Sequence, residues 1–251
     1  MFGSLSYFFQ EKLMFLPEKL EDDFEYNFQH SFEELYFKTP HDGYINAIHF
    51  KCKDMQNRKG VILYFHGNAG NLERWGKIAE LFVDRNYDVL VMDYRTYGKS
   101  KGPLNENVFY SDAQFIYDYL LKMYEESEIN LYGRSLGTGI ASYLASSNSP
   151  KQLILETPYY NIADVAKDRF PFFPVEKLLK YKFPTNEYLT NTSCPITIFH
   201  GTDDNVVPYA SAQKLIELEL ANLKAITIKH GEHNNLADFD SYHKALTELL
   251  E

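Results

Sequence analysis

A serine between two glycines is the feature of this sequence with the clearest chemical potential. The segment G-R-S-L-G, centred on Ser135, directly follows the apolar run 129–132 and opens a helix-like stretch at 136–147. In a strand-to-helix turn of this kind the glycines allow a sharp bend, and the serine hydroxyl is lifted clear of the main chain. The alternative is a small-residue turn that only packs a helix on a strand. Motif and position together favour a nucleophilic serine at position 135.

A serine hydroxyl needs a base to act as a nucleophile, and the base needs a carboxylate that orients it. In chains with such a turn, the acid and then the base follow the serine. After the last two apolar runs come H-G-T-D-D-N-V-V-P, with Asp203 and Asp204, and K-H-G-E-H-N-N-L, with His230 and His233. Spacing does not choose within either pair, because an aspartate could instead cap the following helix and His230 could be a surface turn residue.

A glycine-containing loop, F-H-G-N-A-G-N at residues 65–71, follows another apolar run. Its backbone N–H groups, Asn68 among them, and that of Leu136 are expected to stabilise the negative charge that develops on an attacked carbonyl oxygen. A phosphate-binding loop is not supported, because the segment has neither a G-K-[ST] ending nor a G-x-G-x-x-G pattern. His66 and His200, each at a strand end before a glycine, are interpreted as structural residues that hold loop geometry.

We expect no metal and no cofactor. A metal site built from the two histidines and two aspartates of the later loops would leave the serine turn without a role. The two cysteines, Cys52 and Cys194, are too few and too far apart for a disulfide framework or a thiolate metal site.

Strands and helices alternate along the chain, and these elements position the loops described above. Apolar runs predict eight strands, at residues 32–38, 44–51, 61–65, 87–93, 129–132, 152–155, 195–199 and 224–229. Helical patterns lie at residues 72–85, 106–124, 136–147, 209–220 and 236–250. The first two strands alternate and are predicted antiparallel, whereas the continuous apolar runs that follow are typical of parallel strands with helices on both faces. The prediction is an α/β fold with an eight-stranded, mostly parallel sheet and ligand-binding loops beyond the carboxyl ends of its strands.

A single domain over residues 1–251 is predicted, because no repeat or Gly/Ser/Pro-rich linker divides the chain. Residues 1–30 form an N-terminal extension. The irregular stretch 157–193, rich in Phe, Tyr and Pro, interrupts the alternation and is expected to form a small lid or pocket rim. Its aromatic residues fit an apolar acyl pocket and a packed lid equally well.

Charge and composition restrict the partners. The formal net charge of −10 disfavours nucleic acid, because binding phosphates requires a surplus of Lys and Arg. The aromatic N-terminus lacks a basic leader region and is too short in apolar residues to span a bilayer. We therefore expect a cytoplasmic protein, either soluble or loosely peripheral to a membrane through its N-terminus.

From about residue 44 onward, the chain resembles the α/β-hydrolase superfamily, most closely its bud-emergence-suppressor-like branch, which is similar to the α/β-hydrolase-domain depalmitoylases. The resemblance rests on F-H-G-N-A-G-N, D-Y-R-T-Y-G-K-S-K-G followed by a helix with S-D-A, G-R-S-L-G-T-G, E-T-P-Y-Y-N-I-A-D-V-A, H-G-T-D-D-N-V-V-P and G-E-H-N-N-L. In that pattern the acid falls on Asp204 and the base on His233. Thr96 stands where the family commonly has glycine, and Glu232 where it has a small residue.

The N-terminal residues 10–17, Q-E-K-L-M-F-L-P, resemble a Q-[DE]-x-x-x-F-x-P stretch that follows a membrane anchor in relatives. Motifs and resemblance together predict a serine hydrolase, a carboxylesterase or acyl thioesterase, that forms an acyl-enzyme on a small-molecule ester or thioester. An aminopeptidase-like serine peptidase and a non-catalytic ligand-binding relative are the alternatives. Dehalogenases and epoxide hydrolases of this superfamily carry Asp at the position of Ser135.

Overall fold

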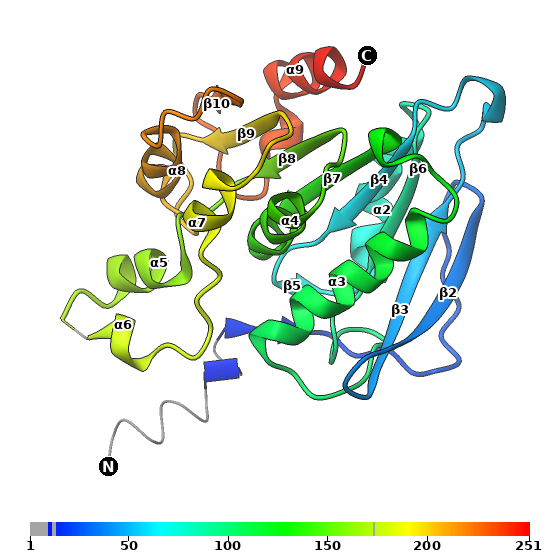
Figure 1. The fold of residues 1–251 in the computed structure, drawn as a ribbon, viewed down its shortest axis with the longest axis horizontal. Helices are drawn as coiled ribbons and strands as arrows, with labels where there is room; N and C mark the ends of the chain where they lie inside the picture. Colours follow the sequence, from blue (N-terminus) through cyan, green and yellow to red (C-terminus); the bar gives the residue numbers. More distant parts are fainter. Residues whose placement is uncertain (1–9, 12–13, 173) are drawn as a thin grey trace.

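An eight-stranded sheet organises the chain (Figure 1). The structure is a computed structural model that describes residues 10–11, 14–172 and 174–251. The strands are β2 (Phe32–Thr39), β3 (Gly43–Phe50), β4 (Val61–Phe65), β6 (Asp88–Met92), β7 (Ile129–Arg134), β8 (Gln152–Glu156), β9 (Ile196–Gly201) and β10 (Leu223–Ile228), in the spatial order β10-β9-β8-β7-β4-β6-β3-β2. All eight match predicted strands to within two residues at each end.

The pairing directions confirm the predicted mostly parallel sheet. β2 pairs antiparallel with β3, and β3 pairs antiparallel with β6, whereas β4, β6, β7, β8, β9 and β10 pair in parallel. At the centre, Leu63 of β4 lies opposite Leu90 of β6 and Leu131 of β7. Every residue of these three strands is buried, which explains why β4 (V-I-L-Y-F) and β6 after its first residue (V-L-V-M) are continuous apolar runs.

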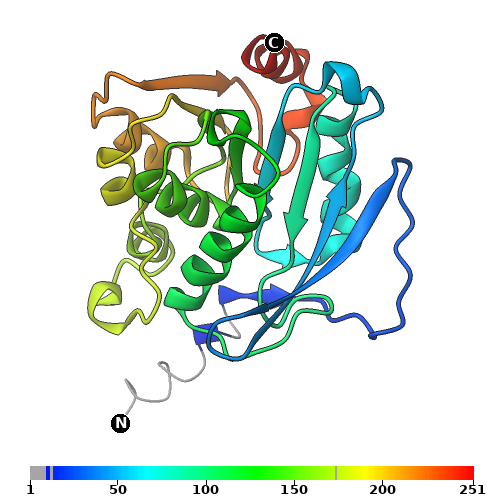
Figure 2. The same ribbon diagram turned by 45° about the vertical axis from the view of Figure 1, so that its right-hand side comes forward.

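Helices cover both faces of the sheet and create two hydrophobic cores. On one face lie α3 (Glu106–Leu120), α4 (Leu136–Ser147) and α8 (Tyr209–Ile216); on the other lie α2 (Leu72–Val83) and α9 (Asp240–Leu250). Leu63 and Phe65 of β4 join the first core and Ile62 and Tyr64 the second, because successive strand side chains point to opposite faces. In the turned view of Figure 2 the green helices α3 and α4 lie on one side of the central strands and the cyan helix α2 on the other.

The stretch 157–193 departs from the prediction, because it is not irregular. It contains α5 (Ile162–Arg169), α6 (Val175–Leu178) and α7 (Thr185–Thr190). Two of the prolines in this stretch, Pro174 and Pro184, stand directly before α6 and α7, where proline leaves the helical hydrogen bonds intact. Likewise the helix predicted at 236–250 is divided into η3 (Leu236–Asp238) and α9, because Phe239 between them is extended.

Two short strands were not predicted. β1 (Leu16–Pro17) pairs in parallel with β5 (Ala69–Gly70), which lies in the loop after β4. The following residue continues this contact, because the Glu18 N–H donates to the Gly70 carbonyl oxygen at 3.3 Å. The N-terminal segment is thereby joined to the glycine-containing loop.

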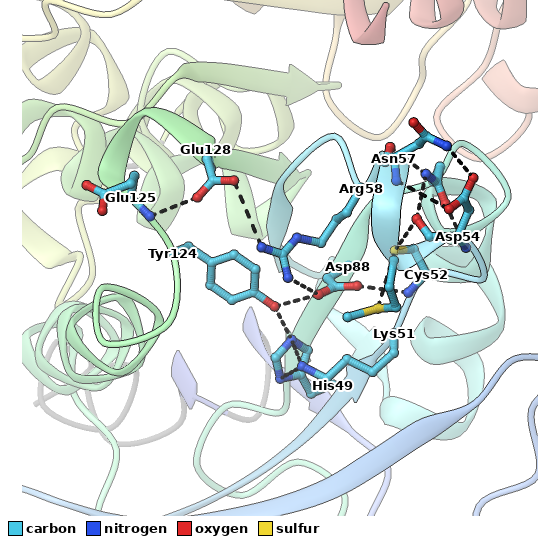
Figure 3. Close-up of polar contacts among 12 residues, drawn as sticks. His49, Lys51, Cys52, Asp54, Asn57, Arg58, Asp88, Tyr124, Glu125 and Glu128 are labelled. Carbon is cyan, nitrogen blue, oxygen red and sulfur yellow. Dashed lines mark hydrogen bonds and ion pairs between the residues drawn. The ribbon is translucent and has the colours of Figure 1, made fainter.

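A buried polar network closes the sheet edge opposite the carboxyl ends of the parallel strands (Figure 3). Asp88, the first residue of β6, accepts hydrogen bonds from Cys52 N (2.8 Å) and the Tyr124 hydroxyl (2.6 Å), and it lies 3.5 Å from the Arg58 guanidinium. Burial raises the pKa of Asp88, but these hydrogen bonds lower it below its ordinary value. The network attaches the loop that precedes β4 to the first residue of β6. Cys52 and Cys194 are both free and buried.

The N-terminus, for which a membrane contact is expected, includes residues 1–9 and 12–13, which lie outside the described residues. Within the described ranges, no helix combines the length and the apolar character needed to cross a bilayer.

Candidate active site

The turn between β7 and α4 holds Ser135 in a conformation that few non-glycine residues adopt. Its backbone has φ 50° and ψ −116°, so the residue stands outside both neighbouring elements. Glycines make the turn feasible: a Cβ on Gly137 would lie 2.1 Å from the carbonyl oxygen of Phe65, and one on Gly133 would lie 2.6 Å from that of Gly137. The close packing of α4 on β4 and β7 therefore requires glycine on both sides of the serine.

Three side chains from three loops form one hydrogen-bonded chain. The Ser135 hydroxyl lies 2.9 Å from Nε2 of His233, and Nδ1 of His233 lies 2.8 Å from Oδ2 of Asp204. A carboxylate only accepts hydrogen bonds, so Nδ1 carries the ring hydrogen and Nε2 is free to accept from the serine. The loops after β7, β9 and β10 thus meet at the carboxyl edge of the sheet, as strand order and direction require.

Asp204 is held as a carboxylate by its surroundings. Oδ1 accepts from the backbone N–H groups of Val206 and Val207, each at 2.9 Å, while Oδ2 faces His233 and lies 3.2 Å from Nε2 of His200. Burial raises the pKa of Asp204, but the contacts with His200 and His233 outweigh it and keep the pKa below its ordinary value. The contact between His200 and Asp204 was not predicted.

The other acid and histidine of these loops lie apart from the serine. Asp203 and His230 form their own exposed pair, with Oδ2 3.2 Å from Nδ1. The four side chains of the metal alternative are therefore divided into two pairs. Among the residues that the structure describes, no group of three or more His, Cys, Asp or Glu side chains is placed to hold a metal ion.

The loop after β4 lies beside the serine. A Cβ on Gly67 would lie 3.6 Å from Cβ of Ser135, and both Asn68 and Leu136 line the cavity that contains Ser135. The buried hydroxyl of Tyr97 donates to the carbonyl oxygen of Asn68 at 2.7 Å, with Oδ1 of Asn68 at 3.1 Å. This contact fixes the plane of the peptide that follows Asn68.

The segment D-Y-R-T-Y-G supports the same loop at two further points. The Tyr94 hydroxyl donates to the carbonyl oxygen of His66 at 2.7 Å, and Oδ1 of Asp93 lies 3.2 Å from Nε2 of His66. Asp93 and His66 are fully buried, and burial raises the pKa of Asp93 although the contact with His66 opposes the rise. Sequence reasoning noted this segment for its resemblance but found no role for its residues.

The same segment also explains the S-D-A helix that follows it. Buried Arg95 donates from Nε and Nη2 to the two carboxylate oxygens of Asp112 in α3, at 2.7 and 2.8 Å. Between the two tyrosines Thr96 has φ 77°, a conformation that favours glycine. This conformation would suit the glycine that the family resemblance leads one to expect there.

A cavity of about 470 Å³ opens from Ser135 and is predominantly apolar. Its walls include Ile162 and Val165 of α5, Val175 and Leu178 of α6, and Val206 and Val207 of the loop after β9. Among the described residues, the polar ones that line it are Gln10, Asn68, Ser135, Tyr159 and Arg169. The wall from residues 159–179 belongs to the stretch predicted to be a rim, whereas the contribution of Gln10 and Met14 was not predicted.

Comparisons with known proteins agree with this architecture. Residues 60–158 match the family model described as alpha/beta hydrolase fold. The lysophosphatidylserine lipase ABHD12 of Danio rerio is 34% identical over 189 residues, 66% of this chain and 49% of that protein. The uncharacterized protein R595 of Acanthamoeba polyphaga mimivirus is 33% identical over 242 residues, 86% of this chain and 80% of that protein. The chain thus spans about half the length of the ABHD12 relative.

Solved structures share the fold. The Pyrococcus furiosus esterase Pf2001 superposes with a TM-score of 0.72 at 17% identity, over 94% of this chain and 97% of that chain. Est1E from Butyrivibrio proteoclasticus, solved with ferulic acid bound, has a TM-score of 0.68 at 20% identity, over 86% and 96% of the two chains. On the sequence matches and the sheet described above, this chain belongs to the α/β-hydrolase superfamily.

Proposed function

We propose that this protein is a serine hydrolase that cleaves carboxylic esters or thioesters whose acyl group is apolar. The observation that carries the proposal is the hydrogen-bonded chain from Ser135 through His233 to Asp204, at the end of an apolar cavity. Relatives named as a lipase and an esterase support the same class of reaction.

In the first half of the proposed reaction, the Ser135 oxygen attacks the carbonyl carbon while Nε2 of His233 takes the hydroxyl proton. Asp204 stabilises the imidazolium that forms, and its low pKa suits this role because it stays charged as the histidine gains its proton. Collapse of the tetrahedral intermediate expels the alcohol or thiol, which receives the proton from His233. The acyl group is then bound to the serine.

In the second half, a water molecule takes the place of the leaving group. His233 accepts its proton, the hydroxide attacks the acyl carbon, and the carboxylic acid leaves as Ser135 regains its hydrogen. In both halves the backbone N–H groups of Asn68 and Leu136 are the proposed donors to the oxyanion. Proximity of the Asn68 loop to the serine and its support by Tyr97 favour this assignment.

The lining of the cavity supports an apolar acyl group as the part of the substrate that is bound there. Residues such as Ile162, Val175 and Leu178 offer no hydrogen bonds to a polar acyl chain, whereas an alkyl chain buries apolar surface against them. Ester and thioester substrates share this acyl half, so the proposal covers both.

Active-site labelling tests the proposal directly. Purified wild-type protein is treated with a fluorophosphonate probe and assayed on p-nitrophenyl acyl esters, acyl thioesters and aminoacyl amides. We expect labelling and ester turnover in the wild type, and a loss of turnover on the order of 10⁶-fold in Ser135→Ala. His233→Gln should lose activity, whereas the matched control His230→Gln should retain it, because His230 pairs with Asp203 on the surface.

Three results would contradict the proposal. Equal labelling of wild type and Ser135→Ala would exclude Ser135 as the nucleophile. Faster cleavage of amides than of esters would favour a peptidase. Tight retention of a fatty acid with no turnover of any substrate would favour a binding protein.

A further inference from the structure

Gln10 contacts a distant part of the chain through both atoms of its side-chain amide. Nε2 donates to the carbonyl oxygen of Leu178 at 2.5 Å, and the N–H of Lys180 donates to Oε1 at 2.7 Å. Only 8% of Gln10 is exposed. The amide thus acts on residues 178 and 180 as a neighbouring strand would, through one donor and one acceptor, and it fixes both the position and the direction of that backbone.

Neighbouring residues reinforce this contact. Glu11 accepts a hydrogen bond from the Tyr181 hydroxyl at 2.7 Å and forms an ion pair with Lys180. The ring of Phe15 packs edge-on against that of Tyr181, with centroids 4.9 Å apart. The N-terminal segment therefore contacts three residues of this stretch: Leu178, Lys180 and Tyr181.

The segment that is held forms part of the cavity wall. Leu178 and Leu179 line the cavity together with Gln10 and Met14. Few fully buried side chains fix this wall: α5 has none, and the four-residue α6 has only Val175. A helix of one turn has no stability of its own, so its position depends on such contacts. Gln10 is thus both a wall residue and the anchor of the adjoining wall.

Building on the proposed function, we propose that Gln10 is a specificity-determining residue that sets the length of acyl chain the enzyme accepts. Its amide holds the backbone at 178–180 in place and so fixes the wall formed by Leu178 and Leu179. Gln10 does not contact Ser135, His233 or Asp204 in the hydrogen bonds described, so its effect should fall on binding of the acyl chain rather than on the chemical steps.

The test compares wild type, Gln10→Ala and Gln10→Glu on p-nitrophenyl esters from acetate to palmitate. In both variants we expect the smallest loss of kcat/KM with acetate, because its two carbons occupy little of a cavity of about 470 Å³. At the wild-type optimum, kcat/KM should fall about tenfold, mainly through KM, and the optimum should move to longer chains. These changes correspond to about 1.4 kcal/mol of binding energy per tenfold. Gln56→Ala, an exposed glutamine in another loop, is the matched control and should leave the profile unchanged.

Gln10→Glu distinguishes a residue that holds the backbone through hydrogen bonds, here called a clamp, from one that only fills space. It keeps the size of the side chain and the acceptor for Lys180, but it places an oxygen against the Leu178 carbonyl. A shift in both variants supports the clamp. A shift in Gln10→Ala alone would show that the side chain only occupies volume, and an equal loss at every chain length would show a general structural role. Either of these results overturns the proposal.

Amide hydrogen exchange gives a readout that does not depend on turnover. The Lys180 N–H should exchange at least about tenfold faster in Gln10→Ala than in wild type, because its acceptor is removed. The Lys182 N–H, which donates to Glu106, serves as the internal reference and should not change. An unchanged Lys180 rate overturns the clamp even if esters are hydrolysed. If the wild type hydrolyses no ester while the Lys180 rate rises, the clamp stands and the proposed function fails.

Discussion

Replacement of Tyr97 by phenylalanine tests whether the geometry of the Asn68 loop controls the rate of the reaction. The substitution removes a single oxygen atom, and the ring remains in a fully buried site. That oxygen donates to the Asn68 carbonyl at 2.7 Å, so the variant leaves this carbonyl without its partner. The residue does not contact Ser135, His233 or Asp204 in any hydrogen bond described for the site, so any effect on catalysis must pass through the loop.

The expected magnitude follows from two limits. Loss of a whole oxyanion-hole donor costs about 10²–10³ in kcat, whereas loss of one neutral hydrogen bond costs about 1 kcal/mol of stability. Tyr97→Phe leaves the proposed donor, the Asn68 N–H, in place and frees only the next peptide, which carries the Asn68 carbonyl. We therefore expect a fall in kcat of about tenfold, equivalent to about 1.4 kcal/mol in the activation free energy, with little change in KM. The melting temperature should fall by about 2–4 °C.

Steady-state kinetics on one short acyl ester and thermal unfolding provide the measurements. Tyr117→Phe is the control, because the Tyr117 hydroxyl is also on a buried ring and donates to Glu126 at 2.9 Å, remote from the serine. It should lower the melting temperature by a similar amount and leave kcat unchanged. An unchanged kcat in Tyr97→Phe, or equal losses of kcat in both variants, would refute the link between Tyr97 and the oxyanion-binding loop.

Three further substitutions test other parts of the structure. Gly137→Ala should lower the unfolding free energy by more than about 3 kcal/mol in urea titrations, because the new Cβ would meet the Phe65 carbonyl oxygen. In an open helix the same change raises stability by about 1 kcal/mol, and such a gain here would contradict the packing. Thr96→Gly should raise the unfolding free energy by about 1 kcal/mol and the melting temperature by about 2–4 °C. The reason is that the strain relieved at φ 77° exceeds the cost of the extra entropy that glycine gives the unfolded chain. A lower melting temperature would argue against strain at this residue. Asp204 has a lowered pKa in the folded state, so its contribution to stability is present above its unfolded value of about 3.9 and is lost as the pH falls below it. The urea midpoints of wild type and Asp204→Asn should therefore start to converge below about pH 5 and continue to converge as the pH falls through the lowered folded-state pKa, and a difference that stays constant from about pH 7 to about pH 2 would exclude this linkage.

The sheet was predictable because its signal is local. Burial on both faces favours continuous apolar runs, and such runs in β4 and β6 are each bounded by polar or glycine residues. The turn at Ser135 was predictable for the same reason, since strand, glycines and helix are adjacent in the sequence. The helices at 162–190 were missed because aromatic and proline residues obscured their short patterns.

Contacts between distant residues could not be predicted from patterns. Nothing in the sequence near Gln10 indicates a partner 168 residues away, and the two bonds it makes are to backbone atoms that leave no residue-specific trace. Spacing alone likewise did not separate Asp203 from Asp204; the family resemblance placed the acid on Asp204, the residue that contacts His233 in the fold. The roles proposed for Asn68 and Leu136 depend on backbone N–H groups, which every non-proline residue possesses.

The attachment of the first residues to β5 and to the α6 region affects how this protein should be shortened or tagged. Boundaries taken from the family match at 60–158, or from the motifs that begin near residue 44, would cut away Gln10 and the strand that pairs with Ala69 and Gly70. Such a truncated protein could retain Ser135, Asp204 and His233 and still handle substrates unlike the full chain. Shortened versions of this protein should therefore keep residues 10–17.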